Sequence, residues 1–145
     1  MGDAQKVSQA EKLGAQEVIL YKKDDFAEKV KKLTDGKGVD VICDHIGPEV
    51  WQKNISCLVR GGRFVTCGVT SGPKVELDLR YFYSRQLTLL GSYMGSFIEL
   101  RRVLELVENG SIVPVVDEVF PLKEAAEAHR RMEERRNFGK IILKV

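Results

Sequence analysis

Few side chains in this sequence could act as acids, bases or nucleophiles, and the histidines are the first to consider. His129 lies among the Glu and Arg side chains of a predicted helix, a setting typical of a surface residue. His45 follows a predicted strand and precedes Gly47, so it lies in a strand-to-helix loop, where open α/β sheets bind their ligands. The plainer alternative is a histidine that hydrogen-bonds to its own loop. The sequence contains no Gly-x-Ser-x-Gly, His-Glu-x-x-His or other metal-ligand pattern, so we assign no catalytic residue and no metal ligand.

Three loops that follow predicted strands carry glycine and small polar residues: Asp44–Gly47, Gly68–Gly72 and Ser92–Gly95. The carboxyl ends of parallel strands meet at one edge of a sheet, and small residues there let a flat ligand approach the backbone closely. This pattern favours a cofactor groove, although glycine-rich turns without a ligand produce the same residues. Neither the dinucleotide motif Gly-x-Gly-x-x-Gly nor the phosphate-binding motif Gly-x-x-x-x-Gly-Lys-Ser/Thr occurs in the sequence.

Strands and helices that alternate along the chain must position these loops. Apolar runs predict strands at Glu17–Tyr21, Val39–Cys43, Arg63–Cys67, Leu87–Tyr93, Val115–Phe120 and Gly139–Val145. Apolar spacing and capping residues predict helices over residues 3–13, 25–35, 48–60, 96–109 and 123–136. Gly61–Gly62 is expected to form a tight turn, and residues 69–85 are expected to be irregular. Strands that are apolar throughout and alternate with helices predict an α/β fold, with a mostly parallel sheet and helices on both faces.

The composition is that of one ordinary globular domain of 145 residues. A net charge of +2 gives no electrostatic reason to expect nucleic acid or an anionic membrane as a partner. No apolar run is long enough for a transmembrane helix, and the N-terminus lacks the apolar segment of a secretory signal. The three widely spaced cysteines, Cys43, Cys57 and Cys67, fit buried thiols in a reducing cytoplasm better than disulfides or a zinc knuckle. We therefore expect a cytoplasmic protein.

Seven short motifs, none specific alone, occur together in one order. They are Lys12-Leu-Gly-Ala15, Gly36-Lys-Gly-Val-Asp40, Asp44-His-Ile-Gly47, Gly61-Gly-Arg-Phe-Val65, Leu89-Leu-Gly-Ser92, Pro121-Leu-x-x-Ala-Ala-x-Ala-His129 and Phe138-Gly-Lys140. In order and spacing the chain resembles the cofactor-binding domain of the medium-chain dehydrogenase/reductase superfamily, which contains zinc-type alcohol dehydrogenases and quinone oxidoreductases. The ending is most similar to the NADPH-dependent quinone and enoyl reductase branch.

The resemblance implies an incomplete Rossmann-like domain, matching the C-terminal portion of the family's cofactor domain over residues 1–145. The first two strands, the glycine-rich loop and the catalytic domain, where zinc-dependent members hold their metal, would then be missing. The parent enzyme would be NADP-dependent and would transfer hydride from the reduced cofactor, NADPH, to a small-molecule substrate such as a quinone, an enone or another carbonyl compound. The 145-residue chain by itself would be inactive and would bind the cofactor weakly or not at all, and zinc is not supported by the residues present.

The resemblance also assigns a partial cofactor-binding wall. Lys6 matches a lysine that approaches the adenosine 2′-phosphate, and Tyr21 matches a tyrosine along the adenosine, while a solvated lysine and an edge aromatic are the plain alternatives. His45 and Ile46 match the loop on the adenine side, although a smaller residue is expected in place of His45. The remaining matches follow the nicotinamide half of the cofactor and are Gly68, Val69, Thr70, Ser92, Tyr93, Met94, Phe138, Gly139 and Lys140.

Two further expectations concern assembly. The alternative to an enzyme is a non-catalytic binding or assembly module. The resemblance supports it, because family members commonly dimerise through strands near the end of this domain. Ser111–Phe120 has the composition of such an edge strand. In the family's strand order, missing strands leave a gap beside Val39–Cys43, and an open strand edge invites pairing. We expect either that Glu17–Tyr21 shifts into this gap or that a second molecule fills it.

Overall fold

The computed structural model describes residues 2–145, and their contacts divide the chain into two compact units. The first unit contains the residues up to 7 and residues 14–94. The second contains residues 8–13 and 95–145. The two units are described in turn, because each has its own sheet and its own buried side chains.

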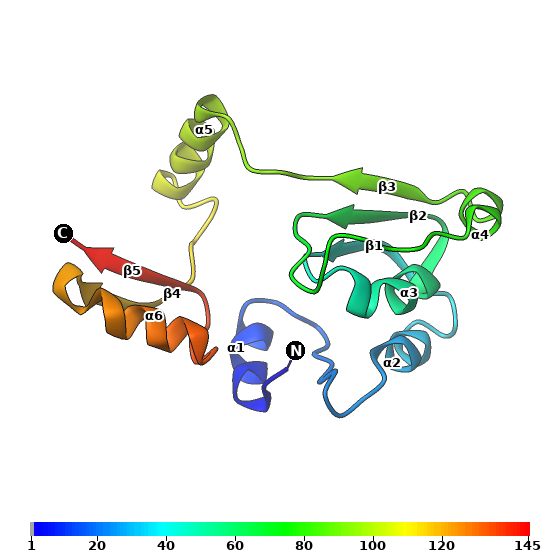
Figure 1. Ribbon diagram of the computed structural model, residues 1–145, viewed down its shortest axis with the longest axis horizontal. Helices are drawn as coiled ribbons and strands as arrows, with labels where there is room; N and C mark the ends of the chain where they lie inside the picture. Colours follow the sequence, from blue (N-terminus) through cyan, green and yellow to red (C-terminus); the bar gives the residue numbers. More distant parts are fainter. Residues whose placement is uncertain (1) are drawn as a thin grey trace. The chain divides into compact units, whose positions relative to one another are not determined.

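The sheet of the first unit has three parallel strands, β1 (Val39–Asp44), β2 (Leu58–Thr66) and β3 (Thr88–Gly91), in the order β1-β2-β3 (Figure 1). Ile42 of β1 pairs with Phe64 of β2, and Phe64 pairs with Leu89 of β3. The parallel arrangement predicted from the apolar strands is confirmed. It brings the loops that follow the three strands to one edge of the sheet.

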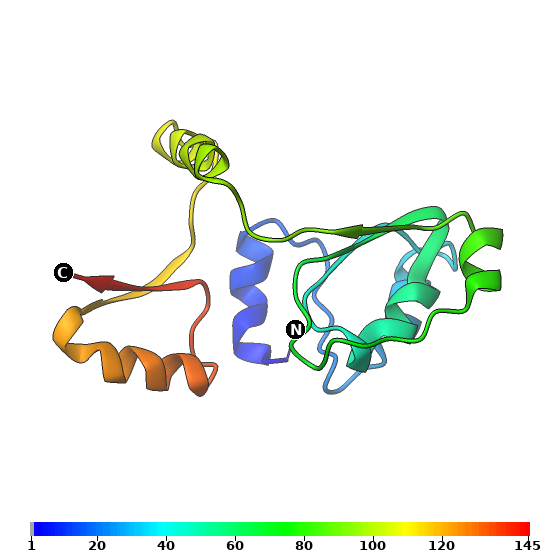
Figure 2. The ribbon, with the colours of Figure 1, turned by 45° about the horizontal axis from the view of Figure 1, so that its top comes forward.

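The core of the first unit lies between this sheet and helix α3 (Pro48–Cys57). Trp51 and Ile55 of α3 are buried against Leu58 and Phe64, and the Trp51 and Phe64 rings meet edge to face with centroids 5.0 Å apart. Helices α2 (Phe26–Leu33) and α3 pack together on the same side of the sheet (Figures 1 and 2). Within the first unit the other face of the sheet stays open: Val41 is 48% exposed.

Side-chain caps begin two helices of the first unit, α2 and a short helix that follows residue 78. The Asp25 carboxylate accepts hydrogen bonds from the N–H groups of Ala27 and Glu28 and begins α2, as the sequence predicted. The Asp78 carboxylate does the same for a short helix, α4 (Leu79–Ser84). The expectation that residues 69–85 are wholly irregular is therefore wrong over α4, because the Asp78 cap stabilises a turn that apolar spacing alone does not reveal.

Two other local predictions are also wrong. Residues 17–20 form no strand, and within residues 2–145 no strand pairs with β1 on the side away from β2, so Glu17–Tyr21 does not shift into the gap. A second molecule at that edge remains a prediction. Gly61 and Gly62 lie inside β2 rather than in a turn before it. They fall where the pairing of β1 with β2 changes register, and the Gly61 N–H donates to the carbonyl of Arg85 (2.8 Å).

The second unit has a sheet of its own, so the expected single sheet is in fact two. Strands β4 (Val116–Pro121) and β5 (Lys140–Lys144) pair in parallel and are joined through a short 3₁₀ turn, η2 (Leu122–Glu124), and helix α6 (Ala125–Glu133). The predicted capping box is confirmed in α5 (Phe97–Glu108): Ser96 and Glu99 exchange side-chain and backbone hydrogen bonds. Helix α1 (Val7–Lys12), preceded by the 3₁₀ turn η1 (Ala4–Lys6), matches the first predicted helix.

The helices of residues 2–145 are short or polar. Not one of them has both the length and the apolar character needed to cross a lipid bilayer.

Candidate cofactor-binding site

The loops that follow β1 and β2 are joined by a network of hydrogen bonds at the carboxyl edge of the first sheet. Asp44, at the end of β1, is only 5% exposed, and its carboxylate accepts a hydrogen bond from the Gly47 N–H (2.8 Å). Its main-chain carbonyl accepts one from the Cys67 N–H (3.0 Å). The carbonyls of His45 and Ile46 accept from the N–H groups of Thr70 (3.1 Å) and Ser71 (2.8 Å). Five predicted cofactor contacts, His45, Ile46, Gly68, Val69 and Thr70, therefore lie in one rigid double loop.

Glycine is required where the two loops approach each other. Gly47 has φ of 92°, in the left-handed region, and a Cβ there would lie 3.1 Å from the carbonyl oxygen of Gly72. A Cβ on Gly68 would lie 3.3 Å from the Cβ of His45. In the structure these two glycines allow close approach of the other loop. Close approach of a flat ligand to the same backbone remains a prediction.

The first amides of α3 are already engaged. Pro48 has no N–H, the Glu49 N–H donates to the Ser71 hydroxyl (3.2 Å), and the Val50 N–H donates to the Gly47 carbonyl (3.1 Å). A helix N-terminus binds phosphate through free N–H groups. The start of α3 therefore anchors the loop after β2 and offers little to a pyrophosphate.

A cleft of about 290 Å³ opens beside the double loop. It is lined by the buried residues Asp44, Trp51 and Phe64 and by the half-exposed Val69 and Leu90, among others. The lining is mostly apolar with few polar groups, which is the usual composition of a site for a flat, partly apolar ligand.

The third predicted loop joins the same edge only at its start. The Ser92 N–H donates to the carbonyl of Thr66 (2.9 Å), which continues the pairing of β2 with β3. Tyr93 and Met94 then point away from the core and are 91% and 85% exposed. Met94 has φ of 47°, in the left-handed region, so the chain turns sharply here.

Lys6 and Tyr21 lie in the N-terminal segment of the first unit. The Lys6 N–H donates to the carbonyl of Asp3 within the first turn. Tyr21 is 44% exposed, and its hydroxyl lies against Gly2, where a Cβ would come within 2.7 Å of it. The adenosine contacts assigned to Lys6 and Tyr21 remain predictions.

In the second unit Phe138 and Gly139 lie in the turn before β5 and Lys140 is the first residue of that strand, and a largely buried carboxylate supports the turn. Asp117 accepts hydrogen bonds from the Phe138 N–H (3.0 Å) and from the Arg131 guanidinium (2.6 Å). Its side chain is 10% exposed. The same pairing holds the pKa of Arg131 above its usual value, first through the hydrogen bond to Asp117. The turn is therefore fixed to β4 and α6.

Sequence reasoning missed the residues that hold these loops in place. The Asp44 carboxylate accepts from the Gly47 N–H, and the Ser71 hydroxyl accepts from the Glu49 N–H and donates to the Ile46 carbonyl. The Asp117 carboxylate accepts from the Phe138 N–H. None of the three was among the predicted contact residues. One signal was present: an aspartate three residues before a glycine, as in Asp44-His-Ile-Gly47, is typical of a side chain that closes its own turn. Ser71 and Asp117 have no local signal, because their partners are distant in sequence.

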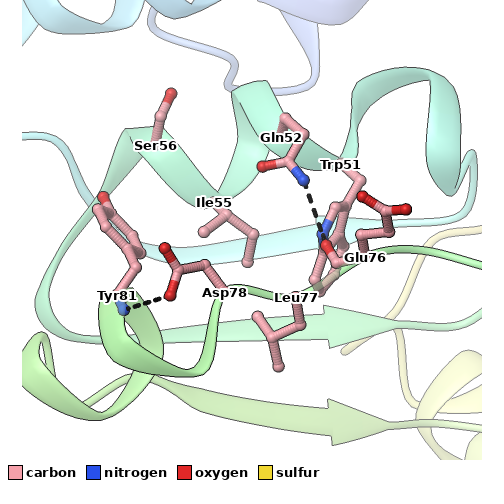
Figure 3. A pocket seen from close by; sticks show the side chains of 8 residues that line it. All are labelled: Trp51, Gln52, Ile55, Ser56, Glu76, Leu77, Asp78 and Tyr81. Carbon is pink, nitrogen blue, oxygen red and sulfur yellow. Dashed lines mark hydrogen bonds between the residues drawn. The ribbon is translucent and has the colours of Figure 1, made fainter.

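A second, smaller cavity of about 180 Å³ lies between α3 and the segment of residues 76–81 (Figure 3). The indole N–H of Trp51 (2.8 Å) and the amide of Gln52 (3.2 Å) both donate to the carbonyl of Glu76. Asp78 and Tyr81 line the same cavity, and the Asp78 carboxylate binds the Tyr81 backbone N–H. Its polar groups are used in fixing the 76–78 segment to α3, so this cavity is structural.

Two thiols lie at the same edge. Cys43 and Cys67 are exposed, so the expectation of buried thiols is wrong for them, and among the three cysteines it holds for Cys57. Partial desolvation raises the pKa of the Cys67 thiol above its usual value, and the neighbouring Cys43 thiol adds to the rise. Among residues 2–145 no group of three or more His, Cys, Asp or Glu side chains could hold a metal ion.

Asp44 provides a direct test of the double loop. We expect Asp44→Ala to lower the free energy of unfolding by about 1–3 kcal/mol, because the Gly47 N–H is left buried without an acceptor. Asp44→Asn, which keeps an acceptor oxygen, should cost less. Urea unfolding of the two variants measures the difference, and equal losses would show that the hydrogen bond to Gly47 does not hold the loop.

The comparisons with known proteins agree with this fold. Residues 13–143 match the family model described as zinc-binding dehydrogenase, and the chain belongs to this family. The resemblance to medium-chain dehydrogenases/reductases is thereby confirmed.

Individual relatives include a 2-haloacrylate reductase of Burkholderia sp, 37% identical over 149 residues that cover 96% of this chain and 45% of the relative. Quinone oxidoreductase 1 of Escherichia coli strain K12 is 32% identical, covering 99% of this chain and 47% of its own length. Among solved structures, an NAD-dependent alcohol dehydrogenase is 42% identical with a TM-score of 0.84, covering 99% of this chain and 42% of that one. The chain thus spans somewhat less than half the length of these relatives.

Proposed function

We propose that this chain forms part of the cofactor-binding region of an NADP-dependent oxidoreductase, which transfers hydride to a quinone, an enone or a similar carbonyl compound. The observation that carries the proposal is the double loop of residues 44–47 and 67–72 beside an apolar cleft, in a chain of the zinc-binding dehydrogenase family. Relatives named as quinone oxidoreductase and 2-haloacrylate reductase support this reaction class.

The residues present fit one part of a dinucleotide better than another. The cleft, lined by Trp51 and Phe64 among others, suits a flat ring and its ribose. The pyrophosphate lacks a comparable site at α3, where the first N–H groups are occupied. Bound NADP would supply the hydride chemistry, and this chain would orient the cofactor through its loops. We propose that sequence preceding this segment in a longer protein supplies the pyrophosphate site and the substrate-binding residues.

Lys6 and Tyr21 would recognise the adenosine end in this proposal, with the Lys6 ammonium near the 2′-phosphate that distinguishes NADP from NAD. The turn of Phe138, Gly139 and Lys140 would close over the nicotinamide end, positioned by Asp117. The three free cysteines support a reducing compartment, and we propose the cytoplasm.

The single tryptophan, Trp51, lines the cleft and is therefore a built-in reporter. We expect NADPH to quench its fluorescence saturably but with weak affinity. Val69→Asp, at a half-exposed position of the cleft lining, should weaken binding at least about tenfold, because the new carboxylate repels the cofactor phosphates. Val113→Asp, at an exposed position of the second unit, is the control and should bind as the unchanged chain does. Equal binding by both variants would overturn the assignment of the cleft.

A second candidate function is assembly of identical chains. Within residues 2–145, β4 and β5 form a sheet of two strands only, and Val116 and Val119 of β4 are 48% and 52% exposed. Two-stranded sheets are marginally stable, and an open edge pairs readily with another chain. This supports a homodimer formed through Ser111–Phe120.

Sedimentation velocity tests the assembly. We expect a concentration-dependent dimer that Val119→Lys shifts to the monomer, because a charge on an edge strand opposes pairing. Ile98→Lys, exposed and in α5 outside this segment, should leave the dimer intact. A chain that stays monomeric at every concentration would exclude this function.

A further inference from the structure

Two thiols lie together at the carboxyl edge of the first sheet, and the proposed function does not use them. Cys43 is near the end of β1 and Cys67 directly follows β2. Both are exposed, whereas Cys57 is buried in the core. The Cys67 N–H donates to the carbonyl of Asp44, so Cys67 continues the pairing of β2 with β1.

The sheet geometry places both side chains on one face. Cys43 of β1 pairs with Val65 of β2, and Cys67 follows Val65 by two residues along the chain. Because side chains alternate along a strand, Cys43, Val65 and Cys67 all project to the same side, the face of the sheet that the helices of the first unit leave open. The Cys67 thiol donates to the carbonyl of Asp44 (3.7 Å), which draws its sulfur towards β1. The Cys43 thiol is close enough to interact with it.

This spacing favours a bridging ion over a disulfide. Adjacent strands lie about 4.8 Å apart and rise about 3.3 Å per residue, so Cα atoms offset by two residues on neighbouring parallel strands are roughly 8 Å apart. A disulfide requires about 4.4–6.8 Å. A metal–sulfur bond is about 2.3 Å long, so an ion between two thiolates joins sulfurs up to about 4.6 Å apart without moving the strands.

The number of ligands limits the kind of ion. Zinc in proteins takes four ligands, and residues 2–145 contain no group of three or more suitable side chains. Soft thiolates select copper(I), which forms stable two-coordinate complexes with them. We propose that Cys43 and Cys67 form a binding site for a soft, two-coordinate cation of the copper(I) type. Binding would release both thiol protons to solvent and leave the metal in its oxidation state.

The test is an anaerobic titration of the 145-residue chain with copper(I), in competition with the chelator bicinchoninate. We expect one ion per chain. Cys43→Ser and Cys67→Ser should each weaken binding by more than the roughly 10–100-fold that loss of an outer hydrogen-bond partner costs a metal site. Cys57→Ser, the matched control, should retain the ion, and Trp51 fluorescence reports whether each variant is folded.

Four results would overturn the proposal: no binding by the unchanged chain, retention of the ion by Cys43→Ser or Cys67→Ser, its loss in folded Cys57→Ser, or dimerisation driven by copper. Treatment of the metal-free chain with diamide provides an independent check of the geometry. We expect no disulfide between Cys43 and Cys67, and its ready formation would contradict the spacing on which the site depends. Neither result depends on NADPH binding, so the outcome is separate from that of the proposed function.

Discussion

Replacing Phe64 by alanine is expected to lower the free energy of unfolding of the first unit by about 3–5 kcal/mol. Phe64 is 2% exposed, lies in the central strand and packs edge to face on Trp51. Its removal takes away a large apolar surface and leaves a cavity beneath α3. Domains are stable by only about 5–15 kcal/mol, so this single change should remove a large part of the stability. Urea unfolding, followed by Trp51 fluorescence, measures it.

Tyr83→Ala is the control for the loss of Phe64. Tyr83 is also an aromatic residue of the first unit but is 70% exposed, so its replacement should change stability by less than about 0.5 kcal/mol. If Phe64→Ala lowers the free energy of unfolding by no more than Tyr83→Ala does, the core of the first unit does not lie around Phe64 as the structure has it.

The second large effect is expected at Gly139, in the turn proposed to close over the nicotinamide. Gly139 has φ of 104°, and a Cβ there would come within 2.4 Å of the carbonyl oxygen of Val115. That carbonyl also accepts the hydrogen bond from the Lys140 N–H (2.8 Å). Gly139→Ala therefore combines left-handed strain of about 1–2 kcal/mol with an overlap of about 1–3 kcal/mol. We expect a loss of roughly 2–5 kcal/mol, measured as faster amide exchange in β5.

Gly110→Ala separates the two causes. Gly110 also has a positive φ, of 76°, but a Cβ there would meet no atom within 4 Å. It should therefore show the strain without the overlap. Equal effects at the two positions would mean that β4 does not approach Gly139 as closely as the structure has it.

Much of the first unit could be predicted from its sequence because its strands read as apolar runs, of which Leu58 and Phe64 of β2 are buried with the apolar face of α3. The prediction was wrong for Glu17–Tyr21, since an apolar run indicates strand character but not whether a neighbouring strand exists to pair with it. Gly61 was misplaced for a related reason: a pair of glycines is compatible with a turn or with a register shift inside a strand. Long-range pairing decides between these, and it is not visible locally.

In the candidate site, too, some features could be predicted from the sequence and others depend on long-range contacts. The loops were found because strands of a parallel sheet end at one edge, a rule that needs only the order of elements. The side chains that hold them, Asp44 and Ser71, were missed because their role depends on distances set by folding. The placement of Tyr93 and Met94, almost wholly exposed, also could not be inferred from the adjacent strand.

The central claim is that the loops after β1 and β2 form a wall for a nicotinamide cofactor. Amide chemical-shift mapping of the 145-residue chain with increasing NADPH tests it most directly. We expect shifts concentrated at residues 44–47, 67–72 and 92, with residues 76–78 beside the structural cavity unaffected. Shifts confined to residues 76–81, or none at all up to millimolar NADPH, would contradict the claim.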